Sequence, residues 1–94
     1  MMQEAWRHRV DVPGESIPVT VAFDPAPSGD AVVVLGHGAG SHLDHATITG
    51  IAASLREVGI STVRYNFVYS EAKKGPPDRM PRLITCLGAV VAHV

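Results

Sequence analysis

The chain has 94 residues, of which 46% are hydrophobic, and its eight basic and nine acidic side chains give a net charge of −1. This length allows one small domain, residues 1–94, and the hydrophobic share argues against a disordered chain. The charges are spread along the chain and no apolar run reaches the roughly 18 residues of a membrane span, so we expect no nucleic-acid partner and no membrane association.

The N-terminus and the cysteine content predict a location. The first nine residues contain no apolar core, so we expect no signal peptide. The one cysteine, Cys86, cannot form an internal disulfide. We therefore expect a cytoplasmic protein, in which Cys86 is a small core residue rather than a nucleophile, because nothing near it in sequence would lower its pKa.

The first 23 residues predict a β-hairpin. Residues 5–12 alternate loosely between apolar and charged side chains, which is typical of an exposed edge strand. Residues 17–23 predict a second strand, and Pro13 and Gly14 between the two favour a turn. Two strands joined in this way most simply pair with each other.

The central pattern is strand, turn, helix and strand. Residues 31–35 are apolar without alternation, which predicts a strand covered on both faces, and the glycine-spaced turn 36–40 follows it. The next amphipathic stretch predicts a helix that begins near Asp44, a good N-cap residue, and ends at Gly59. Residues 60–67 predict another strand, so this unit predicts a right-handed parallel crossover.

The rest of the chain predicts a loop over residues 68–78 and a second helix. Pro81 suits the first turn of that helix. Its apolar stripe consists of Leu83, Ile84, Leu87, Val90, Val91 and Val94. Because the helix reaches residue 94 without a glycine stop, basic last turn or polar tail, we expect the chain to be truncated, the first part of something longer. The predicted fold class is α/β, with a mostly parallel sheet, an antiparallel N-terminal hairpin and two helices.

The turn 36–40 is a candidate site for an anion. Its glycines let another group approach the backbone closely. The following helix directs its free N–H groups and the positive end of its dipole at the turn. Such a place favours a phosphate or a developing oxyanion.

Three stretches stand in an order that is similar to a known family. They are residues 32–40 with His-Gly-Ala-Gly, residues 62–69 with Val-Arg-Tyr-Asn-Phe, and residues 76–91, which begin Pro-Pro-Asp-Arg. Together they resemble the N-terminal half of an α/β-hydrolase, and in particular the small dienelactone-hydrolase-like branch. The resemblance covers roughly residues 17–94 and implies the strand order 1-2-4-3.

The resemblance implies roles for the turn. The backbone N–H of Ala39 would help to form an oxyanion hole, and Gly38 and Gly40 would shape the turn. His37 would brace the loop and would not be the catalytic histidine. No cofactor is implied.

The resemblance also implies a substrate pocket. Asn66, Phe67 and Tyr69 would line one wall of it, and the substrate would be an ester, a lactone or a related small acyl compound. The nucleophile of the family lies in a Gly-x-Ser-x-Gly elbow. No serine in this chain has glycines two residues before and two residues after it, so the triad is absent and we expect the 94 residues alone to be inactive.

Two other functions remain open. A nucleotide-binding βαβ module is one, because Gly36-x-Gly38-x-Gly40 is similar to a dinucleotide fingerprint, although its third glycine falls one residue early. Arg64 would then suit the 2′-phosphate of NADP; otherwise its partner is open. The other is a non-catalytic interaction protein that forms a homodimer through the unpaired edge of strand 31–35.

A metal site is the least favoured alternative. His37, His42 and His45 lie close together in sequence with Asp44. Ligands within one short loop rarely close around a tetrahedral ion, so we expect no metal.

Overall fold

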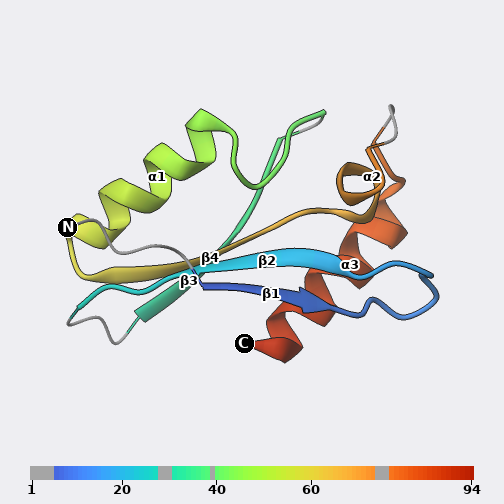
Figure 1. Ribbon diagram of the computed structural model, residues 1–94, viewed down its shortest axis with the longest axis horizontal. Helices are drawn as coiled ribbons and strands as arrows, with labels where there is room; N and C mark the ends of the chain where they lie inside the picture. Colours follow the sequence, from blue (N-terminus) through green and yellow to red (C-terminus); the bar gives the residue numbers. More distant parts are fainter. Residues whose placement is uncertain (1–5, 28–30, 39, 74–76) are drawn as a thin grey trace.

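A computed structural model describes residues 6–27, 31–38, 40–73 and 77–94. Its elements are β1 (Trp6–Val10), β2 (Val19–Asp24), β3 (Ala31–Gly36), α1 (Ala46–Glu57), β4 (Ile60–Tyr65), α2 (Val68–Glu71) and α3 (Met80–His93). The strands form one sheet in the order β1-β2-β4-β3, with α1 on one face and α3 on the other (Figure 1). The α/β class and the strand order agree with the sequence prediction.

The sheet is mixed, which corrects the expectation of a mostly parallel one. The hairpin strands β1 and β2 pair antiparallel, and β2 also pairs antiparallel with β4. Among the described strands, β3 and β4 form the one parallel pair, with Val33 opposite Thr62. The crossover through α1 therefore makes β3 and β4 parallel. β2, the inner strand of the hairpin, runs antiparallel to β4.

The two faces of β4 carry different chemistry, because successive side chains of a strand point to opposite faces. Val63 and Tyr65 belong to the core cluster on the side of α3. Thr62 and Arg64 lie on the other face, below the loop that leads into α1. The buried members of the core cluster are Val10, Val12, Val19, Val21, Val63, Tyr65, Val68, Cys86 and Val90.

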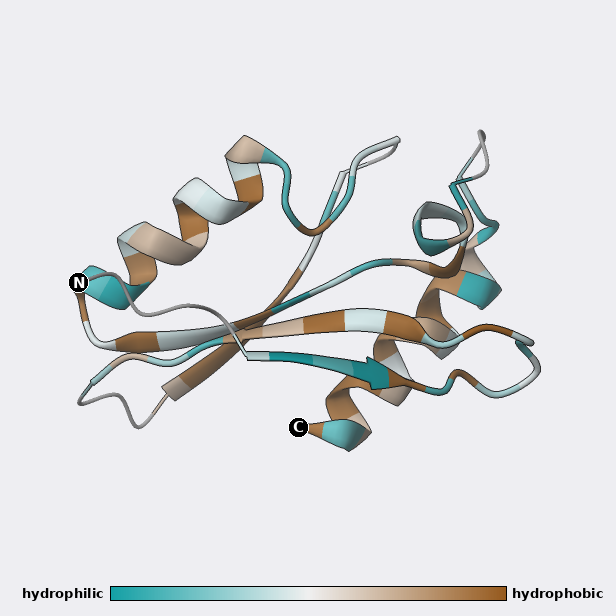
Figure 2. Cartoon of the chain, viewed as in Figure 1, coloured by the Kyte–Doolittle hydropathy of each residue, from teal (hydrophilic) through white to brown (hydrophobic). Residues whose placement is uncertain are grey.

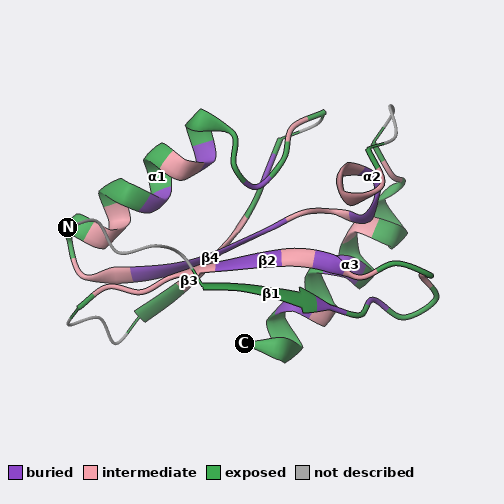
Figure 3. Cartoon of the chain, in the orientation of Figure 1, coloured by how far each residue is buried: buried purple, intermediate pink, exposed green. Residues whose placement is uncertain are grey.

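The outer elements are more exposed than their apolar sequences predict. Residues of β3 are exposed or half-buried, and Val32 is 46% exposed, because β3 is the last strand at its edge of the described sheet. The prediction that both faces of this strand are covered is therefore wrong for these residues. Figures 2 and 3 show the same contrast: β3 is hydrophobic but largely exposed, whereas burial is concentrated in β2 and β4.

The apolar stripe predicted on α3 is also only partly buried. Val90 of the stripe and the neighbouring Cys86 are buried, whereas Ile84, Leu87 and Val91 are exposed. The helix therefore contacts the core through one edge of its apolar surface. Cys86 is a core residue as predicted, and burial raises the pKa of its thiol to about 11.

The residues at the ends of α1 and at the start of α3 test the predictions made from local sequence signals. Gly59 has a φ of +83°, as a left-handed stop after α1 requires, and Pro81 lies in the first turn of α3; both predictions are confirmed. The N-cap of α1 is His45, not Asp44: Nδ1 of His45 accepts a hydrogen bond from the Thr47 N–H at 3.2 Å. The described residues form three helices rather than the predicted two, because α2 forms inside the segment expected to be a loop. No helix in the described part of the chain is long and apolar enough to cross a membrane.

Candidate functional site

Two segments meet where the parallel strands β3 and β4 end. One is the glycine loop, residues 37–45, of which the structure describes all but Ala39; the other is the β4–α2 segment, residues 66–71. Carboxyl ends of parallel strands lie at the same edge of a sheet, and ligands of α/β proteins bind at such edges. This edge is therefore the candidate site.

His37 joins the two segments through both of its ring nitrogens. Its Nε2 accepts a hydrogen bond from the Phe67 N–H at 3.2 Å, so the ring proton lies on Nδ1, which donates to the Gly38 carbonyl at 2.9 Å. The ring is buried and packs edge-on against Phe67, with the centroids 5.0 Å apart. Burial lowers the pKa of His37, and the neutral imidazole is the form that makes both bonds.

Tyr69 contacts the glycine loop on both sides of residue 39. Its hydroxyl accepts a hydrogen bond from the Gly40 N–H at 3.2 Å and lies 3.5 Å from the Gly38 carbonyl oxygen. Gly40 has a φ of +73°, which favours glycine, whereas a Cβ on Gly38 would meet nothing within 4 Å. Ala39, whose N–H the family resemblance assigns to an oxyanion hole, lies outside the described residues.

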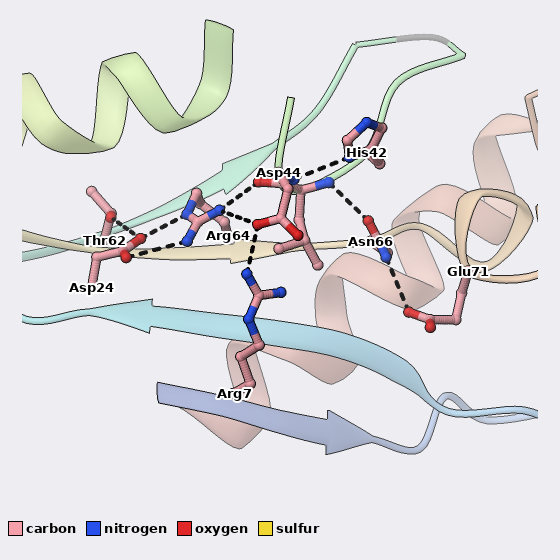
Figure 4. Close-up of polar contacts among 9 residues, drawn as sticks. Arg7, Asp24, His42, Asp44, Thr62, Arg64, Asn66 and Glu71 are labelled. Atoms are coloured by element: carbon pink, nitrogen blue, oxygen red, sulfur yellow. Dashed lines mark hydrogen bonds and ion pairs between the residues drawn. The ribbon is translucent and has the colours of Figure 1, made fainter. Parts of the chain in front are cut away.

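Asn66 holds the far end of the glycine loop (Figure 4). Its Oδ1 accepts a hydrogen bond from the Leu43 N–H at 2.8 Å, and its Nδ2 donates to Glu71 at 3.1 Å. Glu71 also accepts a bond from the Thr20 N–H at 2.6 Å, which ties α2 to β2. Burial raises the pKa of Glu71, but the bonds from Thr20 and Asn66 outweigh that effect and the pKa lies below its usual value.

Arg64 is the residue of this region that sequence reasoning did not explain. Its guanidinium donates to Asp24 through Nε at 2.7 Å, and to the Leu43 carbonyl and Asp44 through Nη1 at 2.6 and 3.1 Å (Figure 4). Burial opposes the charge, but the two carboxylates outweigh it and the pKa of Arg64 is raised. The signal in the sequence was the alternation of β4, which places Arg64 on the face opposite Val63, under the loop.

These contacts remove the support for an NADP site. Arg64 was the residue that would suit a 2′-phosphate, but its side chain is 5% exposed and binds Asp24 and Asp44. A guanidinium that is paired with two carboxylates inside the protein does not present its charge to a phosphate. The prediction that Arg64 would suit the 2′-phosphate of NADP is therefore wrong.

A concavity of about 530 Å³ opens beside the two segments. Its lining consists of Gly40, Ser41, His42, Asn66, Tyr69, Ser70, Glu71 and Lys73. Of the residues predicted for the site, it brings together Gly40, Asn66 and Tyr69. Phe67 does not line it and packs instead between His37 and Tyr65, with ring centroids 5.0 Å from each.

His42 and His45 of the glycine loop each bind a backbone N–H two residues away. Nδ1 of His42 accepts a hydrogen bond from the Asp44 N–H at 3.2 Å, and Nδ1 of His45 caps α1. Within residues 6–27, 31–38, 40–73 and 77–94, no three His, Cys, Asp or Glu side chains are grouped to hold a metal ion.

Several solved structures share this fold. An α/β serine hydrolase homologue from Coxiella burnetii aligns with a TM-score of 0.79 and 20% identity over 100% of this chain and 47% of that one. An α/β serine hydrolase without a lid from Xanthomonas campestris aligns at 0.74 and 27% identity, over 100% and 45%. Dienelactone hydrolase from Anabaena variabilis aligns at 0.71 and 14% identity, over 96% and 44%. The chain thus spans less than half the length of each of these structures.

A family match agrees with the fold. Residues 29–94 match the family described as an alpha/beta hydrolase domain. A search of curated proteins found no match. The matched residues include β3, the glycine loop, β4 and α2, which build the candidate site, and also α3. Since the match covers most of the chain, this protein belongs to the α/β-hydrolase domain family.

Proposed function

We propose that these residues form the oxyanion-loop half of a serine hydrolase that acts on esters, lactones or related small acyl compounds. The observation that carries the proposal is the fixed shape of the glycine loop. Phe67, Tyr69 and Asn66 of the β4–α2 segment, with Arg64 of β4, hold it by four hydrogen bonds to three of its residues, His37, Gly40 and Leu43. Donors that are held in place before the reaction stabilise a developing oxyanion without a cost of reorganisation.

In this proposal the N–H of Ala39 is one oxyanion donor, and the concavity beside Asn66 and Tyr69 is one wall of the acyl pocket. His37 holds the loop and takes no part in proton transfer, because main-chain groups occupy both ring nitrogens. The nucleophile comes from residues outside these 94, since the sequence contains no Gly-x-Ser-x-Gly elbow. The serine hydrolases and the dienelactone hydrolase among the similar structures support an acyl substrate.

The test compares two polypeptides, the 94 residues alone and the same residues extended by the downstream coding sequence. We expect the extended protein to hydrolyse p-nitrophenyl acetate and to react with a fluorophosphonate probe. The 94-residue chain should remain at the background rate and unlabelled. Fluorophosphonate labelling of a serine within residues 1–94, or an extended protein that has the elbow but no turnover, would contradict the proposal.

One observation favours a second, non-catalytic candidate. β3 is the outer strand of the described sheet and carries six uncharged residues, so its free edge offers backbone hydrogen bonds to another strand. In this candidate a second copy of the chain pairs with β3. Its test is the oligomeric state, as set out in the Discussion.

A further inference from the structure

Tyr69 occupies an unusual place between the candidate site and the rest of the fold. It lies in the first turn of α2 with only 6% of its surface exposed. It lines the concavity beside the glycine loop and also a second concavity of about 630 Å³, which contains Glu15, Asp78 and Arg82. Tyr69 therefore lies between the two concavities. Its hydroxyl and its backbone N–H belong to different hydrogen-bond networks.

The hydroxyl end of Tyr69 contacts the glycine loop. It accepts from the Gly40 N–H at 3.2 Å, and its own proton is directed to the Gly38 carbonyl oxygen 3.5 Å away. The ring stacks parallel to that of Phe67 and meets His37 edge-on, with centroids 6.3 and 5.8 Å apart. Packing thus fixes the ring, and the ring fixes where the hydroxyl lies.

The backbone end of Tyr69 is held by Asp78, from the segment that leads into α3. The first N–H groups of a helix lack partners inside it. Oδ2 of Asp78 accepts a hydrogen bond from the Tyr69 N–H at 3.1 Å, and its side chain is 6% exposed. Oδ1 of Asp78 accepts a bond from Arg82 at 2.8 Å, and Arg82 donates two bonds to Glu15 in the turn of the hairpin, at 2.7 and 2.5 Å.

We propose that Tyr69 is a positioning residue of the hydrolase: its hydroxyl sets the separation of the Gly38 carbonyl oxygen and the Gly40 N–H, and Asp78 anchors its backbone. The proposal rests on the proposed function, in which residue 39 supplies an oxyanion donor. The ring of Tyr69 lines the proposed acyl pocket, whereas its hydroxyl acts through the glycine loop. Loss of the hydroxyl lowers the rate of the chemical step, because the displaced oxyanion donor stabilises the developing negative charge less well. Binding of the ester is unchanged, because that charge develops only in the transition state.

The first experiment needs no activity and uses the 94-residue chain with ¹⁵N-labelled backbone. Tyr69→Phe keeps the ring but removes the hydroxyl. We expect the Gly40 amide resonance to shift and its hydrogen-exchange rate to rise about five- to tenfold, as for the loss of one hydrogen bond. Tyr65→Phe is the matched control, because it removes another buried tyrosine hydroxyl, one with no hydrogen bond to the described part of the glycine loop.

The second experiment measures kinetics of the extended protein on p-nitrophenyl acetate. Tyr69→Phe is expected to lower kcat about tenfold with KM unchanged within twofold, whereas Tyr65→Phe leaves kcat within twofold. Asp78→Asn, which keeps an oxygen acceptor for the Tyr69 N–H, should retain more activity than Asp78→Ala.

The outcomes separate this proposal from the proposed function. A Gly40 amide that Tyr69→Phe leaves unchanged overturns the positioning role whatever the activity. A shifted Gly40 amide with unchanged kcat also overturns it, while esterase activity of the wild-type extended protein still supports the proposed function. A wild-type extended protein without turnover overturns the proposed function, and with it the catalytic part of this inference.

Discussion

Arg64 and Asp24 form a two-bond ion pair across the neighbouring strands β4 and β2. Nε of Arg64 lies 2.7 Å from Oδ2 of Asp24, and Nη2 lies 3.2 Å from Oδ1. The same guanidinium donates to the Leu43 carbonyl, so one buried cation connects the sheet to the glycine loop. Bidentate pairs of this kind fix geometry as well as charge.

Asp24→Ala should therefore destabilise the protein strongly. The substitution leaves Arg64 buried without its main counter-ion, and we expect the free energy of unfolding to fall by about 2–4 kcal/mol. Asp44→Ala is the control, because Asp44 also binds Arg64 but its side chain is 49% exposed; the expected loss there is about 0–1 kcal/mol. Urea unfolding followed by circular dichroism measures both, and equal losses would contradict the assignment of Asp24 as the main partner.

His37 should make stability depend on pH. Burial lowers its pKa below the usual 6.5, so the unfolded chain binds this proton more readily than the folded chain. The stability that the neutral ring contributes is complete above pH 6.5 and is lost as the pH falls through the folded-state pKa, with a slope of at most about 1.4 kcal/mol per pH unit.

The measurement is the free energy of unfolding between pH 5 and 7.5, for the wild-type chain and for His37→Gln. Glutamine does not titrate, so the slope below pH 6.5 should be smaller in the variant. Parallel curves for the two proteins would show that His37 does not contribute to the pH dependence.

Gly36→Ala should crowd the base of the site. A Cβ at Gly36 would lie 3.0 Å from the Tyr65 hydroxyl and 3.3 Å from Cζ of Phe67. We expect a loss of about 1–3 kcal/mol, as is usual for overpacking. Gly38→Ala, where a Cβ meets nothing within 4 Å, should change stability by no more than about 0.5 kcal/mol. If crowding is the cause, Gly36→Ala should cost less in a Tyr65→Phe background, which lacks the hydroxyl; an undiminished cost would exclude that cause.

The free edge of β3 should cause self-association of the 94-residue chain. Sedimentation velocity at increasing protein concentration is expected to show dimers or larger species. Val32→Lys adds a charge to the exposed edge strand and should shift the distribution toward monomer. Val58→Lys, at a 72% exposed position at the end of α1, should leave it unchanged. A wild-type chain that stays monomeric throughout would rule out β3 as a dimer interface.

The sequence predicted those parts of the fold that depend on local chemistry. Gly59 and Pro81 are placed by backbone constraints that act within a few residues, and both were predicted correctly. His45 and Asp44 are adjacent residues that can both cap a helix, but the carboxylate of Asp44 is bound by Arg7 at 2.6 Å and by Arg64 at 3.1 Å. Apolar patterning identified β3 and α3, but it could not say how much of each is buried, because that depends on which neighbours cover them.

The sequence named candidate site residues but not their contacts. His37, Asn66 and Tyr69 were named from the family resemblance, whereas their partners lie 23 to 30 residues away along the chain. The pairing of Arg64 with Asp24 spans 40 residues. Such pairs depend on the register of strands that meet only in the folded sheet, and no local pattern encodes that register.

The glycine loop is held from outside itself, and this limits how it can be transplanted. Its hydrogen bonds to Arg64, Asn66, Phe67, Tyr69 and Ser70 come from residues 20 to 31 positions away along the chain. An engineer who copied residues 37–45 into another scaffold would move the motif and leave its supports behind. The portable unit is the pair of segments 37–45 and 64–71, delivered by two adjacent parallel strands.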